Sequence, residues 1–177
     1  VNNYVTFANK LWRIIKITEN GTIRMIENKR AGNYFWDDRY NIDFSSNTGI
    51  NDYRVSRIKD SIEEIYNDDD EFSNTERSFI VPQNVCIGKQ AEEGTDISGS
   101  VECSDILENQ YISLLQVNEY MTASIDNNCV KLTDEQCANY NYMSTFDRSF
   151  WTLTGNTEKS SKVFKVAGSL MLTNASS

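Results

Sequence analysis

The sequence predicts a β-rich α+β fold, and three segments carry that prediction. Residues 10–26 (KLWRIIKITENGTIRMI) contain two β-prone runs joined through Asn20-Gly21. Residues 55–66 place apolar side chains on one face of a helix, and residues 150–173 contain short β-prone runs separated by glycine. Strands near both ends with one clear helix between them indicate a small antiparallel sheet, a flanking helix and long loops.

The first segment predicts a short strand followed by a β-hairpin. Tyr4–Phe7 is β-prone, residues 8–10 form a turn, and residues 11–17 carry apolar side chains on both faces of a strand. Asn-Gly is the favoured central pair of a type I′ turn, in which both residues take φ > 0. We therefore expect residues 22–26 to return antiparallel to residues 11–17.

The main helix is predicted by a stripe of apolar residues at helical spacing. We expect Asn51 or Asp52 to cap its amino end. It should end near Asn67, because Asp68–Glu71 would add four negative charges at the negative end of the helix dipole. The stripe comprises Val55, Ile58, Ile62, Ile65 and Tyr66.

The rest of the chain reads as one domain, residues 1–177, without repeats or linkers. A β-prone run at 79–81 precedes a loop rich in glycine and serine. Residues 111–115 predict a second core strand, and residues 118–124 a short helix. The last predicted strands are residues 150–154, 162–166 and 170–173, with turns at 155–156 and 167–168.

Four cysteines allow three pairings. Their spacing favours two local disulfides, Cys86 with Cys103 and Cys129 with Cys137. The chain contains no C-x-x-C motif and no histidine, so a zinc site would need thiolates from two distant segments. Buried free thiols are the other alternative. Disulfides would place the protein outside the cytoplasm.

The charge of the chain excludes one class of partner. Lys and Arg total 17 against 26 Asp and Glu, which gives a net charge of −9. An average surface of that sign repels the phosphate backbone, so we expect no nucleic-acid partner. No run reaches the roughly 20 apolar residues of a transmembrane helix. With neither a signal peptide nor an initiating methionine, the sequence is expected to be a piece of a longer precursor.

The residue types argue against catalysis and against a cofactor. The absence of histidine removes the usual general base and the usual catalytic zinc ligand. No glycine pattern suits a nucleotide phosphate. Asp68–Glu71 lacks the spacing and the glycine of an EF-hand loop, so we interpret it as a solvated acidic loop, with a weak surface calcium site as the alternative. We expect no enzyme, no cofactor and no dedicated metal site.

Aromatic residues gather in two loop segments. Loop aromatics with Asn and Asp neighbours are typical of surfaces that bind sugars or proteins, and they equally serve to hold long loops onto a small sheet, which is the interpretation we favour. If a binding face exists, its expected residues are Tyr34, Trp36, Tyr40, Tyr140, Tyr142 and Trp151.

Four motifs resemble one known family. Residues 3–15 read N-Y-V-x-F-x-x-x-L-W-R-I-I, and residues 20–26 read N-G-T-I-x-M-I. Residues 114–120 read LLQVNEY, W-T-L-T stands at 151–154, and residues 163–170 read V-x-x-V-x-G-x-L, which is similar to the family's V-x-x-V-x-x-x-G-x-L. Together they resemble an uncharacterised family of extracellular domains from Gram-positive bacteria, found in some proteins behind pilin-like amino-terminal helices.

The resemblance implies a C-type-lectin-like fold, with a small twisted sheet, a flanking helix and long loops on one side. Calcium-dependent sugar binding is not implied, because the E-P-N, Q-P-D and W-N-D motifs are absent. The only proline, Pro82, stands in Val81-Pro82-Gln83, and Trp151 is followed by threonine.

Family members usually continue into one further strand, similar to G-V-R-P-V-I-x-L, beyond the point that corresponds to Ser177. Without it the resemblance implies an open sheet edge. Two functions follow as expectations. The first is a non-catalytic module displayed on the cell surface that binds a protein or a glycan. The second is a structural subunit of a pilus or filament, in which a neighbouring copy fills the open edge.

Overall fold

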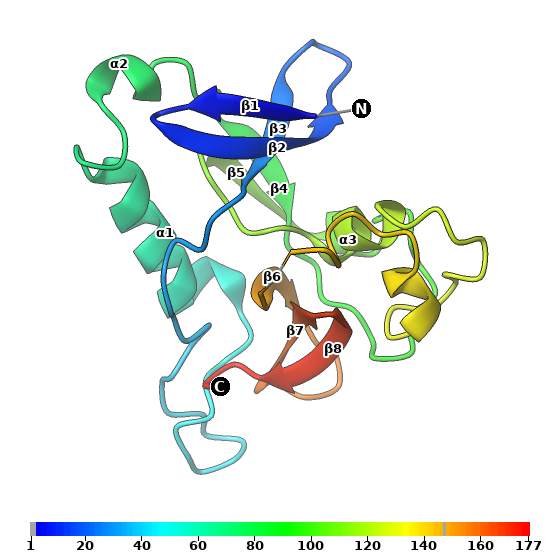
Figure 1. Ribbon diagram of the computed structural model, residues 1–177. Coiled ribbons are helices and arrows are strands. Elements are labelled where there is room, and N and C mark those ends of the chain that lie inside the picture. The colour runs from blue at the N-terminus through cyan, green and yellow to red at the C-terminus, as the bar shows by residue number, and fades with distance from the viewer. Residues whose placement is uncertain (1–2, 147) are drawn as a thin grey trace.

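The computed structural model describes residues 3–146 and 148–177, and it is a mixed α+β protein with three small antiparallel sheets (Figure 1). The first sheet contains β1 (Tyr4–Phe7), β2 (Lys10–Ile17) and β3 (Ile23–Glu27) in that order. The second contains β4 (Gln83–Cys86) and β5 (Ile106–Gln110). The third contains β6 (Phe150–Gly155), β7 (Lys162–Ala167) and β8 (Ser169–Asn174).

The helices lie at the sides of these sheets. Helix α1 (Arg57–Asn67) runs along one side, and α3 (Val117–Thr122) lies with the second cysteine loop on the other (Figure 1). Helix α2 (Asn74–Arg77) is a single turn. Short 3-10 turns span Tyr53–Val55, Glu102–Ser104 and Glu135–Ala138. In the described ranges, no helix combines the length and the apolar character that crossing a membrane requires.

The sequence predicted a single sheet, and this prediction was wrong, because the strands are divided among three sheets. The second and third sheets are linked only by isolated bridges among the described residues, Leu115 with Thr152 and Gln90 with Asn156. Long connections separate the strand pairs in sequence, so each hairpin forms its own ladder. The α+β class and the antiparallel pairing agree with the sequence prediction.

The β2–β3 hairpin is present, but its turn differs from the prediction. Thr18 N–H donates to Thr22 O (2.9 Å), and within this loop only Gly21 takes a positive φ, +82°. This is a three-residue loop with glycine in the left-handed position. The two-residue turn with two positive φ values occurs instead at Ala8 and Asn9 (φ 50° and 55°), between β1 and β2.

Helix α1 confirms the predicted end at Asn67 and the stripe from Ile58 onward, but Val55, predicted as its first member, lies in the preceding 3-10 turn and is exposed. The cap of α1 is Ser56, whose hydroxyl accepts from Lys59 N–H (3.3 Å). Asp52 caps the preceding 3-10 turn instead, so the predicted cap was one turn too early. Ile58 and Ile62 are the helix residues that are buried in the core.

The middle of the chain contains two further corrections. The run at 79–81 forms no strand, and Phe79 is 71% exposed after α2. The strand predicted at 111–115 is wrong: β5 ends at Gln110, the last residue that pairs with β4, and Leu115 forms only an isolated bridge with Thr152. Helix α3 and strands β6 to β8 lie where the sequence predicted them.

Two clusters of buried side chains form the core. One joins α1 to β6 and β7 through Trp36, Ile58 and Leu153. The other joins α3, the second cysteine loop and strands β7 and β8 through Tyr120, Leu132 and Phe164. The β1–β2–β3 sheet contributes only partly buried side chains to the second cluster, so much of its apolar surface faces elsewhere.

Candidate functional site

A groove of about 1420 Å³ lies between the β1–β2–β3 sheet and the elements that follow it. Pockets for small molecules usually measure about 300–1,000 Å³, so this groove has room for a larger ligand. Apolar side chains of α1, of residues 111–116 and of β6 line it. We call it the central groove.

The strands reach the central groove in two different ways. Strand β2 contributes the alternate residues Lys10, Trp12 and Lys16, as one face of a strand does. Strand β3 contributes every residue from Ile23 to Glu27, and β4 every residue from Gln83 to Cys86. Consecutive residues reach a groove when a strand presents its edge. The central groove is therefore bordered by the edges of β3 and β4.

The groove-side edge of β3 carries backbone groups that no other strand pairs. Hydrogen bonds from Asn28 N–H to Leu11 O (2.8 Å) and from Thr18 N–H to Thr22 O (2.9 Å) mark the two ends of the β2–β3 ladder. Bonded positions recur at every second residue of an antiparallel ladder. Ile23, Met25 and Glu27 therefore direct their N–H and C=O away from β2, and within the described ranges these groups join no other backbone hydrogen bond.

On the groove-side edge of β4, a backbone N–H that no strand pairs donates to a side chain instead. Cys86 N–H donates to the side-chain oxygen Oε1 of Gln116 (3.0 Å), a residue that also lines the groove. An amide side chain thus supplies an acceptor where a strand would place a carbonyl.

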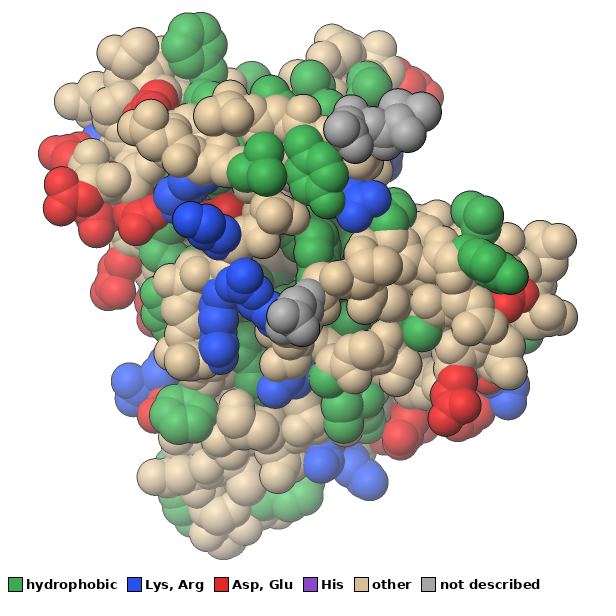
Figure 2. Space-filling model, viewed as in Figure 1, with side chains coloured by type: hydrophobic (Ala, Val, Ile, Leu, Met, Phe, Trp, Pro, Cys, Tyr) green, Lys and Arg blue, Asp and Glu red, His purple; other side chains and the backbone are tan. Residues whose placement is uncertain are grey.

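The charge of the central groove is opposite to that of the whole chain. Seven Lys or Arg but only two Glu are among its described lining residues, whereas the chain carries −9. Figure 2 shows the Lys and Arg side chains gathered around the hollow in the middle of this face, with Asp and Glu mainly toward its margins. The cations are Lys10, Lys16, Arg24, Lys29, Arg30, Arg148 and Lys165.

Two of these cations are paired with the two glutamates. Arg24 holds Glu119 at the start of α3, with Nη2 to Oε2 at 2.9 Å, and also donates to Leu114 O (3.2 Å). Lys10 lies 3.7 Å from Glu27. Burial raises the pKa of Glu27, and Lys10 opposes that rise. Arg24 therefore ties β3 to the opposite side of the groove.

Exposed apolar side chains continue the groove to the surface. Phe79 is 71% exposed, Phe35 54% and Val81 51%. Exposed apolar side chains beside a groove are typical of interaction sites. The segment at 79–81, predicted as a strand, thus forms part of the groove rim.

Two of the six candidate binding aromatics lie in the central groove. Trp151 Nε1 donates to Tyr34 O (2.9 Å), and both residues line the groove. The Lys165 ammonium lies 4.7 Å from the centre of the Trp151 ring. This arrangement leaves a cation and an aromatic face side by side.

The other candidates do not join them. Tyr142 is half-buried beneath the Arg13 guanidinium, 4.3 Å from the ring centre. Tyr140 is 80% exposed, and Tyr40 is exposed in a separate loop. The prediction that Trp36 belongs to a binding face was wrong. Trp36 is fully buried and its Nε1 donates to Thr152 O (2.8 Å), so it cannot touch a ligand.

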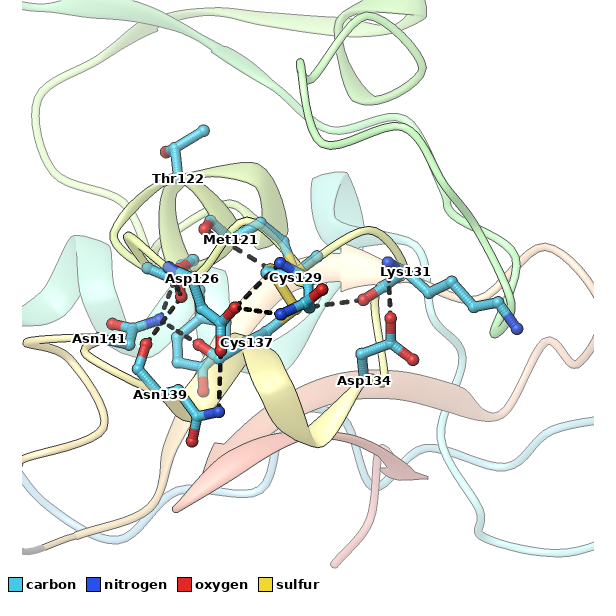
Figure 3. Close-up of a disulfide and its surroundings, with 12 residues drawn as sticks. Met121, Thr122, Asp126, Cys129, Lys131, Asp134, Cys137, Asn139 and Asn141 are labelled. Carbon is cyan, nitrogen blue, oxygen red and sulfur yellow. Dashed lines mark hydrogen bonds between the residues drawn. A yellow bond between two sulfur atoms is a disulfide. The ribbon is translucent and has the colours of Figure 1, made fainter.

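Both disulfides that the spacing favoured are formed, Cys86 with Cys103 and Cys129 with Cys137. Cys86 and Cys103 line the central groove. Figure 3 shows the second disulfide among polar side chains of its loop. Asn141 Nδ2 donates to Cys137 O (2.9 Å), and Asn139 Nδ2 to Asp126 Oδ2 (2.9 Å). A backbone N–H of Asn128 helps to hold the pKa of Asp126 below its usual range. This loop is ordered by its own contacts.

The carboxylates have structural partners rather than a shared centre. Glu102 is fully buried and accepts from the backbone N–H groups of Val117 and Asn118 (2.9 Å each) and from the Thr154 hydroxyl. Burial raises its pKa. In the acidic run at 68–71, Asp69 pairs with Arg77 and Glu71 with Lys10. Across the residues described, no three His, Cys, Asp or Glu converge to hold a metal ion.

Sequence reasoning missed the central groove, although one signal pointed to it. Residues 10–30 contain six of the 17 Lys and Arg of an acidic chain. Five of these six line the groove. Clustered cations in the first hairpin were therefore a sign of a local electropositive surface.

Comparisons with protein-family models, with curated proteins and with solved structures find no match to this chain. The central groove and the residues around it are thus the basis for assigning a function.

Proposed function

We propose that this chain is a non-catalytic extracellular binding module whose ligand is a protein segment held in the central groove. The combination found in the groove carries the proposal: an apolar lining about 1420 Å³ in volume, with seven cations in an acidic chain. Small molecules rarely need that space, and the cations favour an anionic ligand. Glu102 has no catalytic part in this proposal, because α3 and Thr154 already occupy its oxygens.

The proposed location is the cell surface. Two disulfides support an oxidising compartment. Membership of the extracellular family that the motifs resemble, and a C-type-lectin-like fold, are part of the same proposal. The flanking helix α1 and the long loops on either side of the β4–β5 hairpin support it. An experimental structure in which the three sheets align with the strands of that fold would test it.

A second candidate is a structural subunit of a pilus or surface filament. Strands β1 and β3 are both edge strands in the described part of the chain, and a neighbouring copy would complete one of them. In this version the partner is another copy of the same chain. The resemblance to domains behind pilin-like helices supports it.

Arrays of extended peptides and of glycans would test the binding module. We expect retained peptides to be lost with Phe79→Glu, which alters the groove rim. Ile125→Glu is the matched control, because Ile125 is similarly exposed (78% against 71%) but lies outside the groove. Retention of glycans alone, equally by both variants, would contradict the central groove as the site.

Light scattering on the non-reduced protein, with thiol titration of the same sample, would separate the two candidates. A monomer without titratable thiols fits the binding module. A polymer would make the filament subunit the correct assignment.

A further inference from the structure

We propose that the central groove receives an extended segment of a partner protein as an added β-strand between β3 and β4, with alternate side chains apolar and at least one of the others acidic. This inference rests on the proposed function and names the ligand of the same groove. It follows from the backbone of two strands, from the groove lining and from the placement of cations.

The backbone argument starts at β3. Ile23, Met25 and Glu27 direct their N–H and C=O toward the groove. A strand placed about 4.8 Å away would pair these groups, as every ladder does. Five residues of β3 would then be bonded on both sides. Peptides that extend a sheet gain affinity from such main-chain hydrogen bonds.

Strand β4 borders the other side of the added strand. It pairs with β5 alone in the described ranges, and all four of its residues line the groove. The bond from Cys86 N–H to Gln116 Oε1 shows that its groove-side edge offers a donor in the right direction. A peptide that displaced this side chain would join the first and second sheets.

The groove lining selects the side chains of the ligand. Partly buried apolar side chains line the groove, namely Ile65 of helix α1, Ile112 and Leu114, whereas Ile58 and Ile62 of the same helix belong to the core. Successive side chains of a strand point to opposite faces, so every second residue of the ligand would meet apolar surface. Valine or isoleucine suits such a half-buried position.

The cations select the remaining side chains. No carboxylate of a described residue lies within ion-pair distance of Lys16, Lys29, Arg30 or Lys165. Lys16 lies in β2, Lys29 and Arg30 follow β3, and all three residues are exposed. A glutamate or aspartate on the outward face of the ligand would pair with them. The acidic character of the partner thus follows from charge complementarity.

The first experiment uses an acetylated and amidated peptide, Val-Glu-Val-Thr-Val-Glu-Val-Thr, titrated by calorimetry against the intact chain. The matched control carries N-methyl groups on alternate residues, in one peptide for each register, which removes main-chain donors and keeps every side chain. We expect both methylated peptides to bind at least about tenfold more weakly.

Hydrogen exchange locates the added strand. On binding the unmethylated peptide, the amides of Ile23, Met25 and Glu27 should become protected. The amides of Arg24 and Ile26 already face β2, so they should change little. Protection of other amides, while the exchange rates of the Met25 and Glu27 amides stay unchanged, would overturn strand addition.

Charge reversal tests the acidic character. Lys29→Glu with Arg30→Glu should weaken the peptide at least about tenfold. Lys159→Glu is the control, because Lys159 is exposed and lies outside the groove. Equal weakening by both variants would contradict pairing in the groove.

The outcomes separate this inference from the proposed function. Equal binding of methylated and unmethylated peptides, still lost with Phe79→Glu, would overturn strand addition and leave the binding module standing. A failure of every peptide to bind in the groove would overturn both. A multimer that dissociates when the peptide is added would assign the groove to a second copy and overturn a foreign partner.

Discussion

Glu102 is a fully buried carboxylate whose oxygens all have hydrogen-bond donors. Its oxygens receive two backbone N–H groups at the start of α3 and one hydroxyl from β6. It therefore joins α3 to the third sheet. Burial raises its pKa above the ordinary value of 4.5, so folding favours its protonated form.

We predict that Glu102 makes the free energy of unfolding fall as pH rises. A group whose pKa is raised in the folded state stabilises most below its unfolded value, here 4.5, and that gain is lost as pH passes the folded value. Glu102→Gln should lower stability throughout, because its NH₂ would face a backbone N–H. The stability difference between wild type and variant, from urea unfolding, should be larger at pH 4 than at pH 7. A constant difference would contradict the raised pKa.

Asp96 should show the opposite dependence on pH. Its carboxylate accepts from the hydroxyl and N–H of Ser98, from the Ser100 hydroxyl and from Val101 N–H, and the Ser98 hydroxyl is the first cause that lowers its pKa, to about 2. Its stabilising contribution is present above 3.8 and lost as pH falls through about 2. Urea midpoints of wild type and Asp96→Asn should differ at pH 6 and converge toward pH 2. Midpoints that stay apart at pH 2 would argue against this.

At the scale of elements, the two turns of the first sheet differ in how well their residues suit them. Ala8 and Asn9 both occupy the left-handed region, which alanine disfavours. Gly21 occupies the same region in the other turn, where glycine is suited to it.

We predict opposite effects of substitutions in these turns. Ala8→Asn with Asn9→Gly should stabilise the protein by about 1 kcal/mol, because Asn-Gly suits a type I′ turn. Gly21→Ala should destabilise it by about 1 kcal/mol. No atom lies within 4 Å of the added Cβ at Gly21, so the cost would come from the backbone. Thermal unfolding measures both, and the same sign for both would contradict the assigned turns.

Removing the disulfide with the shorter loop should cost more stability than removing the one with the longer loop. Chain entropy alone assigns about 3 kcal/mol to Cys86–Cys103, which spans 17 residues, and about 2.5 kcal/mol to Cys129–Cys137, which spans 8. Cys129 and Cys137 are buried, however, so serines there would bury two hydroxyls. Urea unfolding should show the larger loss for Cys129→Ser with Cys137→Ser. A larger loss for the 86–103 pair would contradict this order.

Sequence periodicity predicted the elements whose contacts are local. The stripe of Ile58 and Ile62 located α1, and alternating residues located β6 to β8, because these patterns arise within one segment. The burial of Trp36 depends on a partner more than 100 residues away, Thr152, so no pattern within one segment contains it. The central groove could be predicted only in part. Its cations cluster in residues 10–30 of the sequence, but the residues of α1, 111–116 and β6 that line it come from distant segments.

For the molecule as a whole, an occupied groove should be a source of stability. A strand between β3 and β4 would connect two sheets that no ladder joins in the described ranges. At 100 times its dissociation constant, the unmethylated peptide should raise the free energy of unfolding by about 2.7 kcal/mol. The melting temperature should rise with peptide concentration, and the methylated peptides should shift it less at equal concentration. An unchanged melting temperature would contradict binding to the folded state.

The open edges of β1 and β3 also bear on colloidal behaviour. Unpaired strand edges on separate copies attract one another and can template sheet growth. The net charge of −9 makes separate copies repel one another, so it opposes association through the open strand edges. Acidification would weaken this repulsion by neutralising the carboxylates. The same edge that admits a strand would then promote precipitation, and the pH of storage would decide between a dispersed protein and an aggregate.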